Sequence, residues 1–155
     1  MLTMYSLSYI LHIASVAIWI GSFFALGYLL KSLVKDERKL ADFTYVTKKI
    51  QTWVMVGVLP SLVIILVSGI YMILQFNRDT MPLYLTIMEQ GGSLIILLTI
   101  ALVSVYSVRL TKKLKGMPSK KERSLADVTK VYANFLLIST LLGMGIIIIV
   151  GLRLV

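Results

Sequence analysis

Four apolar runs divide this chain, and each of them is long enough to cross a lipid bilayer. A membrane-spanning helix needs about 20 mostly apolar residues, because each residue rises about 1.5 Å and the hydrocarbon layer is about 30 Å thick. The runs cover residues 2–30, 50–74, 83–108 and 131–152. Backbone amides in lipid must be paired within their own segment unless strands close into a barrel. Barrel strands alternate in polarity and these runs do not, so the sequence predicts helices.

The amino-acid composition indicates the same class of protein. Hydrophobic residues make up 58% of the chain and charged residues 15%, whereas a soluble protein carries about 25% charged residues. We therefore predict an all-α fold, an integral membrane antiparallel four-helix bundle, that forms one domain over residues 1–155. The expected helices cover about residues 5–31, 47–76, 83–111 and 129–153. The chain has no cysteine, which excludes disulfides, thiolate-bound zinc and iron–sulfur clusters.

The basic residues indicate how the chain crosses the membrane. All lysines and arginines except Arg78 and Arg153 lie in, or close to, residues 32–46 and 112–128. The positive-inside rule makes these two loops cytoplasmic, so we expect a multi-pass plasma-membrane protein with both termini extracytoplasmic. Residues 111–130 contain no aromatic side chain and no motif that reads nucleic acid. The expected partner of this surface is therefore the lipid bilayer, and no nucleic acid is expected.

Small residues predict where the helices touch, because helices in lipid associate through side chains that let their backbones approach. The candidates include Gly21, the pair Ser68-Gly69, and Gly143. Pro60 removes one helical hydrogen bond, which predicts a kink in the second helix. Tyr132, close to the start of the last run, is expected to anchor its helix at the membrane interface.

Two ionisable side chains, His12 and Glu89, fall inside the apolar runs, where a charge costs about 3 kcal/mol on insertion scales. Counting about 1.5 Å per residue from the outer helix ends places both at a similar depth. His12 shares one helical face with Ser8, Ser15 and Trp19, which predicts that this face points into the bundle. We therefore expect a site near the outer leaflet that is centred on His12.

Haem b is the first cofactor that suits this set of side chains. Imidazole is a usual axial ligand of haem iron, and Ser15 and Trp19 would line the pocket beside His12. A serine or Glu89 would orient the other ring nitrogen. Because the chain has one histidine, a second axial ligand would come from a methionine or from His12 of a partner in a homodimer. The candidate methionines are Met72, Met88 and Met144.

Copper is the alternative cofactor, because thioether sulfurs and imidazole suit Cu(I), and Met72 and Met88 lie toward the outer half with His12. Glu89 is a further candidate metal ligand. The residues alone also leave open a neutral histidine bonded to a neighbouring helix, and a histidine that transfers protons. A serine triad would have to use His12, the single histidine, in a buried setting, and no nucleophile elbow appears. We therefore identify no catalytic residue, and the sequence does not decide whether the chain is an enzyme.

The first helix resembles that of two families, the CopD-type copper-resistance membrane domain and the HemJ-type protoporphyrinogen oxidases. The similar segment is Leu11-His12-Ile13-Ala14-Ser15-Val16-Ala17-Ile18-Trp19-Ile20-Gly21-Ser22-Phe23-Phe24. The stretch Val67-Ser68-Gly69-Ile70-Tyr71 is similar to the glycine-containing end of their second helix.

The resemblance implies a small four-helix membrane protein that binds haem b through the first-helix histidine or handles copper on the outer side. The HemJ-type enzymes carry a lysine, and typically a further histidine, in helix three, where this chain has Glu89-Gln90-Gly91-Gly92. CopD-type domains also usually carry that lysine. Only His12, Trp19 and Gly21 are therefore carried over from the families.

These observations predict a haem b or metal site at His12 that serves electron transfer or haem and copper handling. The expected cofactor-binding residues are His12, Ser15, Trp19, Met72 and Met88, and the expected metal ligands are His12 and Glu89. Two alternatives remain: copper import, and a cofactor-free accessory or transport subunit of a larger membrane complex.

Overall fold

A computed structural model describes residues 3–35, 40–116 and 124–153, and it places the side chains of all of these except residues 40–42. Within these ranges the chain forms four long helical rods and no strand, which confirms the predicted all-α fold. The first rod is α1 (Met4–Lys35) and the fourth is α6 (Leu125–Gly151). The second rod joins α2 (Leu40–Trp53), the π-helical segment η1 (Val54–Val58) and α3 (Leu59–Ile73). The third joins α4 (Leu83–Ile87), the π-helical segment η3 (Met88–Gly92) and α5 (Ser93–Leu114).

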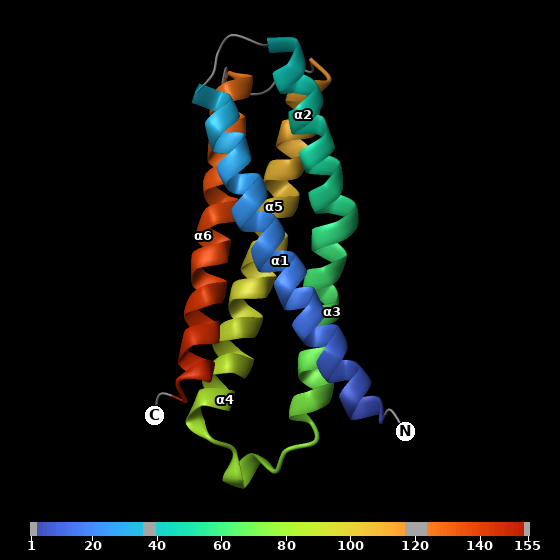
Figure 1. Cartoon of the computed structure of the whole chain (residues 1–155), viewed down its shortest axis with the longest axis vertical. Coiled ribbons are helices and arrows are strands. Elements are labelled where there is room, and N and C mark those ends of the chain that lie inside the picture. Colours follow the sequence, from blue (N-terminus) through green and yellow to red (C-terminus); the bar gives the residue numbers. More distant parts are fainter. Residues whose placement is uncertain (1–2, 36–39, 117–123, 154–155) are drawn as a thin grey trace.

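All four rods are long and apolar enough to cross a membrane. In Figure 1, α1 packs between α6 and α3, and α5 packs against α6 and α3. The first and third rods run in one direction and the second and fourth in the other, so each rod is antiparallel to the neighbours that it packs against. Both ends of the chain lie at the same end of the bundle as the connection from α3 to α4, which contains the short 3₁₀ turn η2 (Arg78–Thr80). We call this the terminal end. The opposite end, which carries Lys35, Lys112, Lys113 and Lys115, is the lysine-rich end.

Two helices begin earlier than their apolar runs indicate. The second rod starts at Leu40 rather than at residue 47, because Phe43 and Ile50 are buried on one face while the other face stays polar. The fourth rod starts at Leu125 rather than at residue 129. There the Ser124 side chain accepts a hydrogen bond of 3.0 Å from the Asp127 amide and caps the helix. The two expected loops were residues 32–46 and 112–128, and their central parts, residues 36–39 and 117–123, lie outside the described residues.

The distortion predicted at Pro60 takes the form of η1, the π-helical segment that ends two residues before it. Pro60 lies at the start of α3 but inside the continuous second rod, so it lacks the amide hydrogen that would bond to a carbonyl of η1. A π-helical segment inserts an extra residue into a turn and often marks a functional position. The second such segment, η3, contains Met88 and Glu89, two of the expected site residues.

The tightest contacts between rods lie between α1 and α6, and glycines make them. A Cβ atom at Gly27 would lie 2.9 Å from the Leu137 side chain, and one at Gly143 would lie 2.8 Å from the ring of Trp19. The packing role expected for Gly143 is confirmed, whereas the one expected for Gly21 is wrong, because no atom would lie within 4 Å of a Cβ there. We expected Tyr132 to anchor its helix at the membrane–water interface, and this prediction is wrong. Its side chain is fully buried and faces into the bundle from α6.

The surface and the interior have the polarity of a membrane protein. Large apolar side chains cover the outside, and Val56 is 73% exposed. The buried polar side chains of the described residues are serines and threonines, among them Ser139 and Thr140, each of which can bond within its own helix or to a neighbour. An exposed apolar surface of this extent suits a lipid environment.

Candidate functional site

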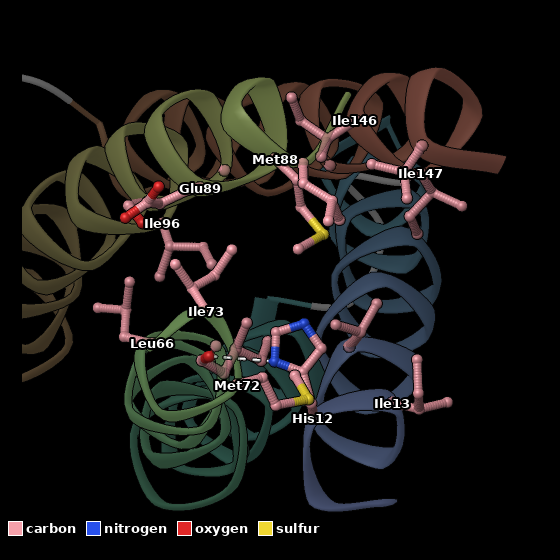
Figure 2. A pocket seen from close by; sticks show the side chains of 18 of the residues that line it. His12, Ile13, Leu66, Met72, Ile73, Met88, Glu89, Ile96, Ile146 and Ile147 are labelled. Atoms are coloured by element: carbon pink, nitrogen blue, oxygen red, sulfur yellow. Dashed lines mark hydrogen bonds between the residues drawn. The ribbon is translucent and has the colours of Figure 1, made fainter. Parts of the chain in front are cut away.

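A cavity of about 700 Å³ opens among the four rods at the terminal end (Figure 2). Every rod contributes to its wall, and most of the lining side chains are apolar, such as Ile73, Ile96 and Ile146. No side chain of α4 or η3 is buried, and residues of both segments, such as Leu85 and Met88, line the cavity. His12, Trp19, Met72, Met88 and Glu89 all line it. Five of the six expected site residues are thus brought together.

His12 is held by α3 in a defined orientation. Its Nδ1 atom lies 3.1 Å from the backbone oxygen of Ile65 and 3.0 Å from the hydroxyl oxygen of Ser68. The Ile65 carbonyl can only accept, so Nδ1 carries the hydrogen and donates it. In the neutral imidazole the Nε2 atom then presents a lone pair, and Figure 2 shows this second ring nitrogen directed into the cavity.

The two partners of His12 were not among the expected orienting groups, which were Ser8, Ser15 and Glu89. Ser68 donates its own hydrogen to the Ile64 carbonyl, so its lone pairs are free to accept from Nδ1. Gly69 lets the ring approach the backbone of α3, because a Cβ there would lie 3.3 Å from His12 Cε1. The serine-glycine pair on the neighbouring helix was the available signal, but the sequence indicated only a packing contact and a family resemblance there and not a partner for His12.

Two thioethers share the cavity with the imidazole. Met72 lines the cavity from α3, and Figure 2 shows Met88 lining it from η3. Met72 is 8% exposed. Met144, the third methionine considered as a ligand, is 45% exposed and does not line the cavity. The structure therefore leaves Met72 and Met88 as the expected thioethers that line the cavity with His12.

Trp19 forms part of the inner wall and is fixed from α6 and α5. Its indole nitrogen donates to the Ser139 hydroxyl at 3.2 Å, and Ser139 shares a hydrogen bond of 2.9 Å with Thr99. The ring rests on the backbone at Gly143. Ser15, which was also expected at the site, is buried but does not line the cavity. Trp19 thus shapes the cavity, and Ser15 lies within the bundle away from it.

Glu89 is engaged by an arginine rather than by His12. The Arg78 Nη1 atom donates to one carboxylate oxygen at 3.0 Å and the Nη2 atom donates to the other at 2.9 Å. The Glu89 side chain is 24% exposed and that of Arg78 is 62% exposed. No hydrogen bond joins Glu89 to His12 in the described part of the chain. The sequence placed Arg78 and Glu89 at one end of the bundle without predicting that they pair.

Among the residues that the structure describes, no group of three or more histidine, aspartate or glutamate side chains lies close enough to share a metal ion. A metal in the cavity would therefore rely on His12 with the methionine sulfurs. Comparisons of the chain with models of known protein families, with curated proteins and with solved structures find no match.

Proposed function

We propose that the cavity binds one haem b group through His12 and that the chain serves electron transfer or haem handling in the plasma membrane. One observation carries this proposal: the Nδ1–H of His12 is fixed on α3 while the lone pair of Nε2 faces an apolar cavity of about 700 Å³. A ligand histidine typically donates its other N–H to a carbonyl or carboxylate, which fixes the tautomer and the ring orientation. A histidine with a purely structural role needs no empty volume in front of its second nitrogen.

The size and polarity of the cavity suit a large, mostly apolar group. Small-molecule and cofactor sites usually enclose about 300–1,000 Å³ and are lined mainly by hydrophobic side chains. A single metal ion needs far less space. The sulfurs of Met72 and Met88 line the same cavity as His12, so either of them would be a thioether ligand from this chain, and His12 of a partner in a homodimer is the alternative. When bound, haem iron supplies one-electron oxidation and reduction.

The position of the lysines supports a location of this site in the outer half of the membrane. The lysines that the structure describes lie in the half of the bundle opposite to the cavity, and basic residues are retained on the cytoplasmic side. Both termini and the cavity would then face outward from the plasma membrane.

Copper import or copper handling is the second candidate, and the two methionine sulfurs that line the cavity with His12 favour it. Soft thioether ligands and imidazole select Cu(I). His12, Met72 and Met88 would hold the ion, since both oxygens of Glu89 are already bonded to Arg78.

Absorption spectra test the proposal directly. We expect protein purified in mild detergent from haem-sufficient cells to show a Soret band and to yield haem b on extraction. His12→Ala should abolish the band without changing the yield or the elution volume. Met88→Leu should shift the band, whereas the matched control Met144→Leu, outside the cavity, should not.

A protein that contains no haem but about one copper per chain would instead support the second candidate. Absence of both would leave a cofactor-free accessory or transport subunit. A Soret band that survives in His12→Ala would contradict the assignment of the ligand.

A further inference from the structure

One cation stands next to the cavity, held by a residue of the cavity wall. Arg78 belongs to the turn η2, and its side chain extends to Glu89 on η3. The two hydrogen bonds of 3.0 and 2.9 Å form a bidentate ion pair. This geometry fixes the plane of the guanidinium group, although 62% of the arginine side chain is exposed.

The ion pair uses only part of the donor capacity of Arg78. A guanidinium group has five N–H donors, and the pair with Glu89 engages one on each Nη atom. The Nε–H and the second hydrogen of each Nη atom make no other hydrogen bond within the described residues. The Nε–H and a neighbouring Nη–H point in parallel, which is the arrangement that binds a carboxylate side-on. Arg78 can therefore bind a second carboxylate without releasing Glu89.

The charge of the cavity explains why such a cation matters. Glu89 is the only acidic residue among those that line the cavity, and no lysine or arginine lines it. Unpaired, its carboxylate would attract a metal cation and repel an anionic ligand. Because Arg78 neutralises it and offers further donors, the pair favours an occupant with carboxylate groups over a bare cation such as Cu(I).

We infer that Arg78 is the anchor for the carboxylates of the molecule in the cavity and that Glu89 is the residue that positions its guanidinium group. The ligand class is a large apolar molecule with carboxylates on one edge. Haem b belongs to this class, since it has an apolar macrocycle with two propionates at one side, so this inference rests on the proposed function. His12 would then hold the metal and Arg78 the acidic edge.

The experiment compares two ligands that differ only in the carboxylates. Protein from haem-deficient cells is titrated in detergent with haem b or with its dimethyl ester, in which both propionates are esterified. Only binding with the His12-dependent Soret band is counted. We expect the unaltered protein to bind haem b about tenfold more tightly than the ester, which corresponds to about 1.4 kcal/mol.

Arg78→Gln should remove this preference by weakening haem b binding about tenfold and leaving ester binding unchanged. Arg78→Lys keeps the positive charge but loses the parallel N–H donors of the guanidinium group, so it should retain part of the preference for haem b over the ester. The matched control is Arg153→Gln, because Arg153 is the other arginine at the terminal end and does not line the cavity.

Equal binding of the two ligands by the unaltered protein, or a preference that persists in Arg78→Gln, would overturn the role of Arg78 and leave the proposed function intact. If neither ligand binds, the proposed function fails and the inference fails with it.

Discussion

Replacing Gly143 with alanine tests the packing that forms the inner wall of the cavity. The added Cβ would lie 2.8 Å from Cη2 of Trp19 and 3.2 Å from two further ring atoms. The ring has little room to move, because Trp19 is 4% exposed and its indole nitrogen is bonded to Ser139. Extra volume in a well-packed core costs about 1–3 kcal/mol.

Gly145, two residues further along α6, provides the matched control, because a Cβ there meets no atom within 4 Å. A change from glycine to alanine inside a helix is itself favourable by about 1 kcal/mol, and this term is shared by both variants. The difference between them therefore isolates the contact with Trp19. We expect Gly143→Ala to be less stable than Gly145→Ala by about 1–3 kcal/mol.

The assay is reversible unfolding of the purified protein in mixed micelles, followed by circular dichroism. Tryptophan fluorescence should report the same order, since Trp19 is one of two tryptophans in the chain. If the two variants unfold at the same denaturant concentration, the close contact between Gly143 and Trp19 is not present in the folded protein.

Two further substitutions test the site and the helix boundaries. Gly69→Ala places a Cβ 3.3 Å from His12 Cε1, so the ring must shift by a few tenths of an ångström. Haem affinity should then fall while protein yield stays constant. An unchanged Soret band and affinity would contradict the close contact between the His12 ring and the backbone of α3. Ser124→Ala removes the cap of α6 and should lower the free energy of unfolding by about 1 kcal/mol. An unchanged stability would show that α6 does not begin at this cap.

The spans and the face of α1 that carries His12 could be predicted because hydropathy and helical periodicity depend only on the sequence. The earlier start of α2 could not be read from hydropathy, since residues 40–49 are apolar on one face only and their average is polar. Amphipathic periodicity around Phe43 and Ile50 was the signal that would have extended the helix.

The site was predicted in part. The sequence places His12 and Glu89 at a similar depth and Met72 and Met88 in the same outer half, and all four line the cavity. One of the two partners of His12 is a backbone carbonyl, which every residue has, so no residue type could identify Ile65. The ion pair between Arg78 and Glu89 forms because the turn η2 directs the arginine side chain toward η3. The tertiary structure sets that direction, so the sequence did not predict the pair.

The burial of side chains is uneven along the bundle, and this has a consequence for how a large molecule enters. The fully buried apolar side chains, such as Leu30, Leu110 and Leu136, belong to the middle and the lysine-rich half, whereas α4 and η3 contain none. Segments with few buried contacts separate at a lower free energy than the rest of a fold. The terminal half of the third rod is therefore the part whose separation from α1 and α3 would cost the least free energy. We therefore expect a large apolar molecule to enter the cavity at the terminal end, while the well-packed half of the bundle stays folded.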